Sequence, residues 1–308
     1  MFQLFTSQVS YVTYGIAGVL LVGTLVIAAF KSRFSAKLYT KLTTSMRSWW
    51  LLAILYCVAI SFNKTLYIGL FALLALLAFY EFCQFSRVRV NKRVLACCHI
   101  LIVLHYLVIL NCPVAFMWVS VCISVSVIFV VVKLSSDLNN SLRVTLKLFS
   151  GIFICSFLLG HVAALINLEP TGDYSSAGVA LFLVLLTELN DVFQFIWGKL
   201  FGRCKIVKAI SPNKTLEGYL GGILTTTAVG LGIAPLLLPL NPVQVLIGVL
   251  IVSLGGCIGD LLMSAFKRYF KVKDTSALIP GHGGILDRLD SLCISSPLFF
   301  YYCLYVVS

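Results

Sequence analysis

The sequence predicts an all-α, polytopic integral membrane protein with about ten transmembrane helices, nine being the alternative. Of its 308 residues, 60% are apolar and only 11% are charged, whereas soluble domains average about 45–50% apolar and about 25% charged residues. Apolar segments recur along the whole chain, and the polar stretches between them are too short to form a hydrophobic core of their own. We therefore predict a single membrane domain over residues 1–308.

Ten apolar segments define the predicted spans, at residues 11–30, 49–62, 66–85, 94–110, 114–132, 148–167, 177–197, 218–239, 243–263 and 291–307. The first is expected to remain as a helix, because Lys31 is the first charged residue and no basic region precedes the segment as it does in a cleaved signal. The second is the weakest, since its apolar run covers only 51–62. We retain it because the basic residues of 31–47 would otherwise change sides, and because Trp49 and Trp50 are typical of a membrane interface.

The lysines and arginines are concentrated in every second connection between the predicted spans. All of the 23 except Lys64 lie in five segments, at 31–47, 87–93, 133–147, 199–214 and 267–288. The positive-inside rule makes these segments cytoplasmic and places both termini on the opposite side. This distribution accounts for the formal charge of +12 without a nucleic-acid partner. Segment 31–47 is either an ordinary basic loop or an interfacial helix on an anionic leaflet.

The uneven distribution of acidic residues distinguishes two parts of the predicted membrane domain. Residues 1–176 form N-terminal helices. Residues 177–308 form predicted catalytic helices, with cytoplasmic loops at 198–217 and 264–290. Seven of the 11 acidic residues lie in the second part, near its predicted cytoplasmic face: Glu188, Asp191, Glu217, Asp260, Asp274, Asp287 and Asp290. A carboxylate within a span is costly and therefore marks a functional candidate, which singles out Glu188, Asp191 and Asp260. Glu188 could instead pair with a lysine on a neighbouring span.

If the ninth span continues as a helix, one of its faces carries an acid, a hydroxyl and three bases. Asp260, Ser264, Lys267, Arg268 and Lys271 follow one another at helical spacing. Magnesium commonly binds one or two carboxylates together with substrate phosphates, so this face suits a metal ion with phosphate oxygens above it. Cationic side chains extending to the interface from a helix end are the alternative.

A basic, glycine-rich loop follows directly, over 273–290. Gly281, Gly283 and Gly284 permit positive φ and a close approach of main-chain amides to phosphate oxygens. His282 can donate or relay a proton, and the loop ends in the acids and base needed for metal and phosphate binding: Asp287, Arg288 and Asp290. The histidines within apolar spans are expected to serve packing or hydrogen bonding: His99, His105 and His161.

The segment 198–218 supplies a second basic, glycine-containing block. Ser211 followed by Pro212 predicts a helix start, with Ser211 as the N-cap, free amides facing an anion, and Lys214 adding a charge. Plain capping of the eighth span is the alternative. The spacing of Gly218 and Gly222 indicates close helix packing rather than catalysis.

The stretch from Ser264 to Asp290 resembles the signature of the phosphatidate cytidylyltransferase (CDP-diacylglycerol synthase) family. The residues that fit it are Ser264, Phe266, Lys267, Arg268, Lys273, Asp274, Ser276, Ile279, Pro280, His282, Gly283, Gly284, Asp287, Arg288 and Asp290. Residues 190–218 are also similar to the family, in Asp191, Gly198, Gly202, Arg203, Lys205, Ser211, Pro212, Lys214, Thr215, Glu217 and Gly218. Met263 stands where many members carry Glu, and Val192 where many carry Ser, which indicates a divergent branch.

The resemblance implies transfer of CMP from CTP to phosphatidic acid or a related anionic lipid phosphate, giving CDP-diacylglycerol and pyrophosphate. It implies Mg²⁺ ligated by Asp260 and Asp287, with Asp191 and Asp290 as further ligands. Catalytic roles then fall to Lys267, Arg268 and His282, the last at the leaving pyrophosphate. Substrate binding falls to Lys205, Ser211, Lys214, Thr215, Ser264, Lys273, Gly283, Gly284 and Arg288.

The same resemblance implies an active site facing the cytoplasm from a bacterial inner membrane, with membrane lipids as neighbours, and leaves a homodimer open. Three other functions stay open. They are a CTP-dependent polyprenol or lipid kinase, a membrane transporter without transferase activity, and an inactive assembly partner. A transporter should place its ionisable groups near the bilayer midplane, whereas here they gather at one predicted face.

Overall fold

The computed structural model describes residues 6–33, 35–88, 90–116, 118–120, 122–123, 125–126, 138–276, 278 and 283–307. Across these residues the regular structure is helical, with one isolated antiparallel bridge between Lys205 and Thr215. Nine helical segments of the described chain are long and apolar enough to cross a membrane, at Ser7–Ala29, Ala36–Phe62, Lys64–Phe85, Lys92–Asn111, Leu142–Asn167, Ser176–Phe201, Leu216–Leu237, Pro242–Tyr269 and Leu286–Val306. The polytopic all-α prediction is confirmed, and the predicted span 114–132 lies only in part within the described residues.

Most of these segments are single helices, namely α1 (Ser7–Ala29), α2 (Ala36–Phe62), α3 (Lys64–Phe85), α4 (Lys92–Asn111), α8 (Ser176–Phe201), α9 (Leu216–Leu237) and α10 (Pro242–Tyr269). Two segments are composite. The first joins α6 (Leu138–Ile152), a π-helical stretch (Phe153–Leu158), α7 (Leu159–Ala164) and a 3-10 turn (Leu165–Asn167); the second joins α11 (Leu286–Leu289) to α12 (Leu292–Val306).

Polar N-caps explain where several helices begin. The side chains of Ser35, Asn63 and Ser175 each accept a hydrogen bond from a main-chain amide in the first turn of α2, α3 and α8. At α10, Asn241 and Gln244 form a reciprocal capping box, with Pro242 in the first turn.

The structure corrects the prediction for segment 31–47. A short 3-10 turn covers Lys31–Arg33, and α2 begins at Ala36, so Arg47 lies on the same helix as Trp49 and Trp50. The apolar run alone underestimated this helix because helical hydrogen bonding continues through its polar first turns.

Glycines allow α8 and α9 to pack closely. A Cβ on Gly222 would lie 2.5 Å from Cγ of Gln194, and one on Gly218 would lie 2.9 Å from the main-chain oxygen of Gln194. The prediction that Gly218 and Gly222 serve helix packing is confirmed.

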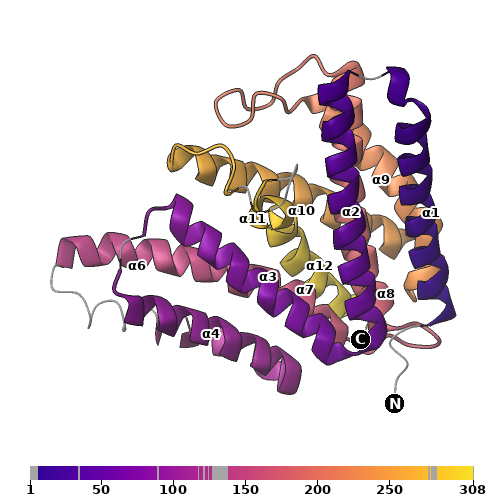
Figure 1. The fold of residues 1–308 in the computed structure, drawn as a ribbon. Coiled ribbons are helices and arrows are strands. Elements are labelled where there is room, and N and C mark those ends of the chain that lie inside the picture. The colour runs from indigo at the N-terminus through magenta and orange to yellow at the C-terminus, as the bar shows by residue number, and fades with distance from the viewer. Residues whose placement is uncertain are drawn as a thin grey trace.

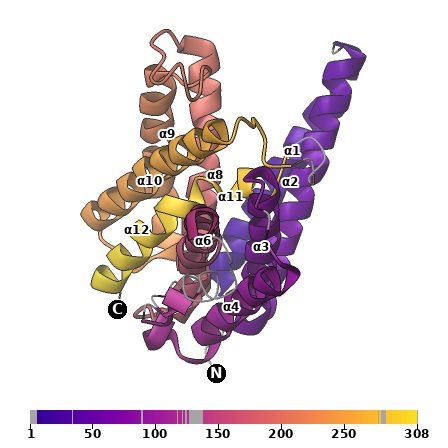
Figure 2. The ribbon, with the colours of Figure 1, turned by 90° about the vertical axis from the view of Figure 1, so that its left-hand side faces the viewer.

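Helices α1, α2, α8 and α9 run roughly parallel to one another, and α3, α4 and α6 lie at an angle to them (Figure 1). The hairpin of α8 and α9 carries the loop 202–215 at one end, and the start of α1 and the end of α12 lie at the other end of the molecule (Figures 1 and 2). Helices α3, α4 and α6 spread away from the upright α1 and α2 (Figure 1). The short α11 lies between α3 and α10 (Figures 1 and 2).

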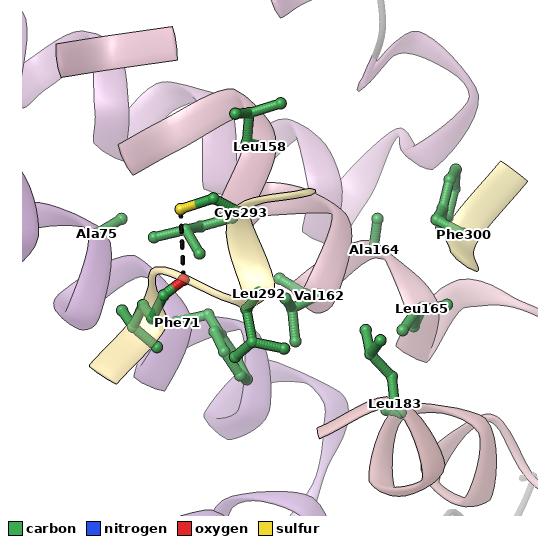
Figure 3. Close-up of a cluster of buried hydrophobic side chains, with 14 of the residues drawn as sticks. Phe71, Ala75, Leu158, Val162, Ala164, Leu165, Leu183, Leu292, Cys293 and Phe300 are labelled. Carbon is green, nitrogen blue, oxygen red and sulfur yellow. Dashed lines mark hydrogen bonds between the residues drawn. The ribbon is translucent and has the colours of Figure 1, made fainter. Parts of the chain in front are cut away.

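A buried apolar cluster holds α12 in the middle of this arrangement (Figure 3). Leu292 and Cys293 of α12 pack among Phe71 of α3, Val162 of α7 and Leu183 of α8, all of them buried. The Cys293 thiol donates to the main-chain oxygen of Leu289 at 3.3 Å, which ties α12 back to α11. The core therefore fixes the acidic residues at the start of this span relative to α3, α7 and α8.

Two exposed cysteines test the predicted topology. Cys204 lies in the loop 202–215 and Cys112 follows α4 on the predicted opposite side. A membrane-impermeant maleimide should label Cys112 in intact cells and Cys204 only after permeabilisation, with Cys112→Ser and Cys204→Ser as matched controls. Labelling of Cys204 in intact cells would reverse the orientation.

Candidate active site

One cavity of about 490 Å³ is lined by residues from three helical spans and from the loop that precedes α11. Its walls are formed by Asp191 of α8, Asp260 and Lys267 of α10, Asp274 and Gly283 of the loop, and Asp287, Arg288 and Asp290 around α11. The four carboxylates predicted as metal ligands therefore share one cavity with a lysine and an arginine from the predicted set. The sequence motifs 190–218 and 264–290 meet there.

Lys267 neutralises the acidic wall. Its ammonium donates to Oδ1 of Asp287 at 2.7 Å and lies 3.8 Å from Oδ2 of Asp290. Lys267 is only 8% exposed, so its charge and those of the two carboxylates compensate one another in a poorly solvated site. This pairing places Lys267 inside the cavity rather than at the interface.

Asp287 has a structural task as well. Its Oδ2 accepts hydrogen bonds from the amides of Thr275 at 2.9 Å and Gly284 at 3.0 Å, and from the Thr275 hydroxyl at 3.0 Å. Together with the Lys267 bond, these contacts engage both carboxylate oxygens. Asp287 thus ties α11 to the loop and to α10, a role that the sequence did not predict.

Asp191 and Asp260 are less fully engaged than Asp287. Asp191 accepts from the Ser291 hydroxyl at 2.7 Å through Oδ2, while its buried Oδ1 has no hydrogen-bond partner among the described residues. Asp260 forms an ion pair with Lys214 and accepts from Ser264 at 3.3 Å. Burial lowers the pKa of Lys214, and the carboxylates of Asp191 and Asp290 oppose that shift.

The donor set suits a metal ion that takes few protein ligands. Within the described parts of the chain, no three His, Cys, Asp or Glu side chains form a group that could hold a metal ion. Magnesium commonly binds one or two carboxylates plus phosphate oxygens and water, and this needs no such group. The unpartnered Oδ1 of Asp191 fits that requirement better than the fully engaged Asp287.

The loop between α8 and α9 corrects the predicted helix start. Thr215, not Ser211, is the N-cap of α9, and its hydroxyl accepts from the amide of Gly218 at 3.2 Å. Ser211 instead belongs to a turn, in which its main-chain oxygen accepts from the amide of Lys214 at 3.3 Å. The Glu217 carboxylate accepts from the amides of Arg203 and Cys204, so the loop folds back onto the first turn of α9.

Several predicted phosphate ligands lie outside the cavity lining. Arg268 donates to the main-chain oxygens of Ile210 at 3.2 Å and Val272 at 2.8 Å, and thereby joins the two basic loops. Lys205 and Lys273 are exposed, and Lys271 lies beyond the end of α10 with a φ of 59°. His282 lies outside the described residues.

The two described glycines of the loop have different reasons to be glycine. Gly283 lines the cavity with a φ of 83°, a conformation that favours glycine. Gly284 is packed so closely that a Cβ would meet Oγ1 of Thr275 and lie 2.5 Å from Oε2 of Glu81. The prediction of special backbone geometry is confirmed for Gly283, and Gly284 is required by close packing.

Glu81 is a functional candidate that the sequence interpretation missed. It belongs to α3, is 1% exposed, and accepts hydrogen bonds from the Ser276 hydroxyl and the Ile285 amide of the loop 273–290. The same argument that singled out Glu188, a carboxylate within an apolar span, applies to Glu81. Glu81 lies more than 100 residues before the acidic cluster at 188–290, and no local motif connects the two.

A second cavity, of about 320 Å³, adjoins the first. The two share Asp191, Asp287, Arg288 and Asp290, and the second adds Glu188, Val192 and Phe195 of α8 and Ser45 and Trp49 of α2. No ion pair joins Glu188 to a lysine in the described structure. Nε of Arg288, at the shared wall, is buried without a hydrogen-bond partner among the described residues.

The predicted histidine roles are confirmed. His105 forms hydrogen bonds with the hydroxyls of Ser156 at 2.8 Å and Ser120 at 2.7 Å. The Nδ1 atoms of His99 and His161 each lie within 2.9 Å of a main-chain oxygen four residues earlier.

Comparison with known proteins identifies relatives of this chain. A sequence profile of the cytidylyltransferase family matches residues 43–306. YnbB of Escherichia coli K12, described as an uncharacterized protein, is 38% identical over 269 residues, which are 86% of this chain and 89% of YnbB. Phosphatidate cytidylyltransferases of Staphylococcus epidermidis RP62A and Staphylococcus aureus COL are each 44% identical over 119 residues, 38% of this chain and 46% of theirs.

The staphylococcal similarity thus covers less than half of those enzymes, whereas the family profile and YnbB cover most of this chain. The profile includes the helices that carry every residue of the cavity. The resemblance predicted from the sequence is confirmed, and the chain belongs to the cytidylyltransferase family.

Proposed function

We propose that this protein transfers the cytidylyl group of CTP to phosphatidic acid, giving CDP-diacylglycerol and pyrophosphate for phospholipid biosynthesis. The observation that supports this most strongly is the cavity that α8, α10 and α11 line. It combines four carboxylates with Lys267 and Arg288 beside membrane-spanning segments. Such a site can bind metal, phosphates and a lipid headgroup together.

In the proposed reaction, a phosphate oxygen of the lipid attacks the α-phosphorus of CTP. The bond from that phosphorus to the oxygen bridging to the β-phosphorus breaks, and pyrophosphate leaves with the electron pair. Because the attacking phosphate is largely ionised near neutral pH, the protein needs mainly to neutralise and align charge. Arg288 lies at the wall common to both cavities, where its guanidinium could contact both phosphates.

Magnesium is the metal that we propose, held by Asp191 and Asp260, because two carboxylates suffice when phosphate oxygens and water complete the coordination. When bound, it would stabilise negative charge on the phosphates. Asp287 would then serve mainly to hold α11 against α10 and the loop, because Lys267, Thr275 and Gly284 already engage its oxygens.

We assign CTP to the larger, more acidic cavity and the lipid headgroup to the smaller one. Phe195 is 68% exposed and Val192 36% exposed, so both offer apolar surface on α8 for acyl chains beside the shared Arg288. Val192 is also a departure from the usual motif, which makes the second cavity the natural place for a different acceptor preference. The site would face the cytoplasm of a bacterial inner membrane, where CTP is available.

The proposal can be tested with purified protein in lipid nanodiscs, supplied with CTP, Mg²⁺ and phosphatidic acid. Mass spectrometry should detect CDP-diacylglycerol and equimolar pyrophosphate. Diacylglycerol, which lacks the phosphate nucleophile, is the matched control and should give no product. Phosphatidic acid formed from diacylglycerol would instead indicate a lipid kinase.

Lys214→Ala should raise the KM for CTP by about tenfold or more and change the KM for lipid little, since a charge-assisted contact to a phosphate is worth about 1.5–3 kcal/mol. An ion pair joins Lys214 to Asp260, which lines the larger cavity. Steady-state kinetics with each substrate varied would measure both constants. Lys208→Ala, an exposed lysine of the same loop, is the control, and an unchanged CTP KM in Lys214→Ala would refute the assignment.

A further inference from the structure

Glu81 lies far from the catalytic motifs in sequence but directly against them in space. It stands near the end of α3, and its side chain is 1% exposed. A buried carboxylate is costly unless charged or polar donors satisfy it. The donors that satisfy Glu81 all come from one segment, 275–286.

Four hydrogen bonds connect Glu81 to this segment. Oε1 accepts from the Ser276 hydroxyl at 2.6 Å and the Ile285 amide at 2.9 Å, whereas Oε2 accepts from the Leu286 amide at 3.0 Å and the Thr275 hydroxyl at 3.1 Å. The carboxylate thus joins both ends of the loop that precedes α11. Hydrogen bonds to an ionised acceptor are the stronger kind.

The same segment is held from its other side by Asp287. The Thr275 hydroxyl lies 3.0 Å from Oδ2 of Asp287 and 3.1 Å from Oε2 of Glu81, so the two carboxylates share it. Gly284 fits between them without room for a side chain. A shift of Glu81 would therefore be transmitted to Gly283 and Asp287, which line the cavity.

Helix α3 is itself fixed against α10. The rings of Phe82 and Phe266 lie 5.7 Å apart, as do those of Phe85 and Phe270. Lys147 of α6 donates to the main-chain oxygen of Ser86 at 2.7 Å. Glu81 thus projects from a helix end whose position relative to α10 is set by packing.

We infer that Glu81 is a positioning residue for the loop before α11: it holds the two ends of that loop, at 275–276 and 285–286, so that Gly283 and Asp287 face the cavity. No ion pair involves Glu81 in the described structure, so it does not serve as a counter-ion to a lysine or arginine there. Helix α3 belongs to the predicted N-terminal part of the chain, which would then contribute directly to the site. The kinetic part of the test below rests on the proposed function, whereas the exchange part does not.

Glu81→Gln is the sharpest variant, because it preserves size. In either orientation of the amide, one of the two main-chain donors, Ile285 or Leu286, loses its acceptor. Hydrogen exchange of these two amides should accelerate at least about tenfold. The kcat per folded molecule should fall between about tenfold and a hundredfold, as expected for a misplaced catalytic group.

Two controls separate positioning from stability. Ile68→Ala alters a buried residue on the same helix, and it should lower stability without accelerating exchange at 285 and 286 or lowering kcat per folded molecule. Glu169→Gln makes the same chemical change at an exposed site before α8 and should change neither quantity.

Ser276→Ala covers the case in which Glu81→Gln does not fold, since it removes one of the four bonds and leaves three. It should lower kcat in the same direction by a smaller factor, and its effect should be less than additive with that of Glu81→Gln. Unchanged exchange at 285 and 286 in Glu81→Gln, or full kcat per folded molecule in both variants, would overturn the inference. Accelerated exchange in a protein that shows no cytidylyl transfer even as wild type would support the positioning of the loop and refute the proposed function.

Discussion

Lys267→Met should give a protein that is both strongly destabilised and inactive. The substitution removes the cation that lies 2.7 Å from Asp287 and 3.8 Å from Asp290 and leaves both carboxylates buried without it. Breaking a buried ion pair in this way typically costs about 3–5 kcal/mol. Denaturant unfolding in detergent and turnover in nanodiscs would measure the two losses.

The matched double variant Lys267→Met with Asp287→Asn removes both partners of the closest pair. It should regain part of the lost stability, because no unpaired charge remains at Asp287, and it should stay inactive. Lys271→Met, which removes an exposed lysine beyond the end of α10, should change neither quantity much. If Lys267→Met unfolds like wild type, Lys267 does not neutralise the acidic wall.

Asp191→Asn and Asp260→Asn should each reduce turnover by at least about a hundredfold while leaving the fold largely intact. Each change keeps the size of the side chain and removes a proposed metal-ligand charge. Metal stabilisation of phosphate charge is worth several kcal/mol, and about 1.4 kcal/mol corresponds to a factor of ten in rate. The residual activity should require a higher magnesium concentration, which a magnesium titration of initial rates would reveal.

Asp173→Asn provides the control for these two variants, because Asp173 is exposed and lies before α8, at the far end of that helix from the cavity. It should keep the wild-type rate and magnesium dependence. Near-normal rates at ordinary magnesium in folded Asp191→Asn and Asp260→Asn would contradict the proposed metal site. Reduced stability with unchanged magnesium dependence would assign both residues a structural role.

That the four acids share one site could be predicted from the sequence, because all of them lie in or beside the two motifs 190–218 and 264–290. Asp191 and Asp260 were expected within spans near one membrane face, and Asp287 and Asp290 in the loop after the ninth span; all four line one cavity. The positions of basic residues and the lengths of apolar segments are properties of whole segments. They predict on which side of the membrane each motif lies, and therefore which motifs can lie close together.

Individual side-chain partners were less predictable. Ser211 and Thr215 are both good N-caps by residue type, and the choice depends on the main-chain bond from Leu216 to Cys204 and the carboxylate of Glu217, which fold the loop back. Arg268 matches a phosphate-binding motif, yet it donates to main-chain oxygens of two loops. Local patterns do not specify such tertiary contacts.

Glu81 shows most clearly what could not be predicted from the sequence. Its partners lie 194–205 positions later in the chain, and no local motif connects them. The burial cost of a carboxylate in a span was the available signal, and it indicates importance without identifying a partner. Only the packing of α3 against α10 and α11 shows which segment this carboxylate holds.

The central claim is that the lipid attacks the α-phosphorus of CTP, and isotopic labelling tests it most directly. Purified wild-type protein would be incubated with phosphatidic acid, magnesium and CTP labelled with ³²P at either the α or the γ position. Cytidylyl transfer predicts that the α label enters the organic lipid phase and that the γ label is released as pyrophosphate. Entry of the γ label into lipid, with the α label left in soluble CDP, would contradict the account and establish phosphoryl transfer instead.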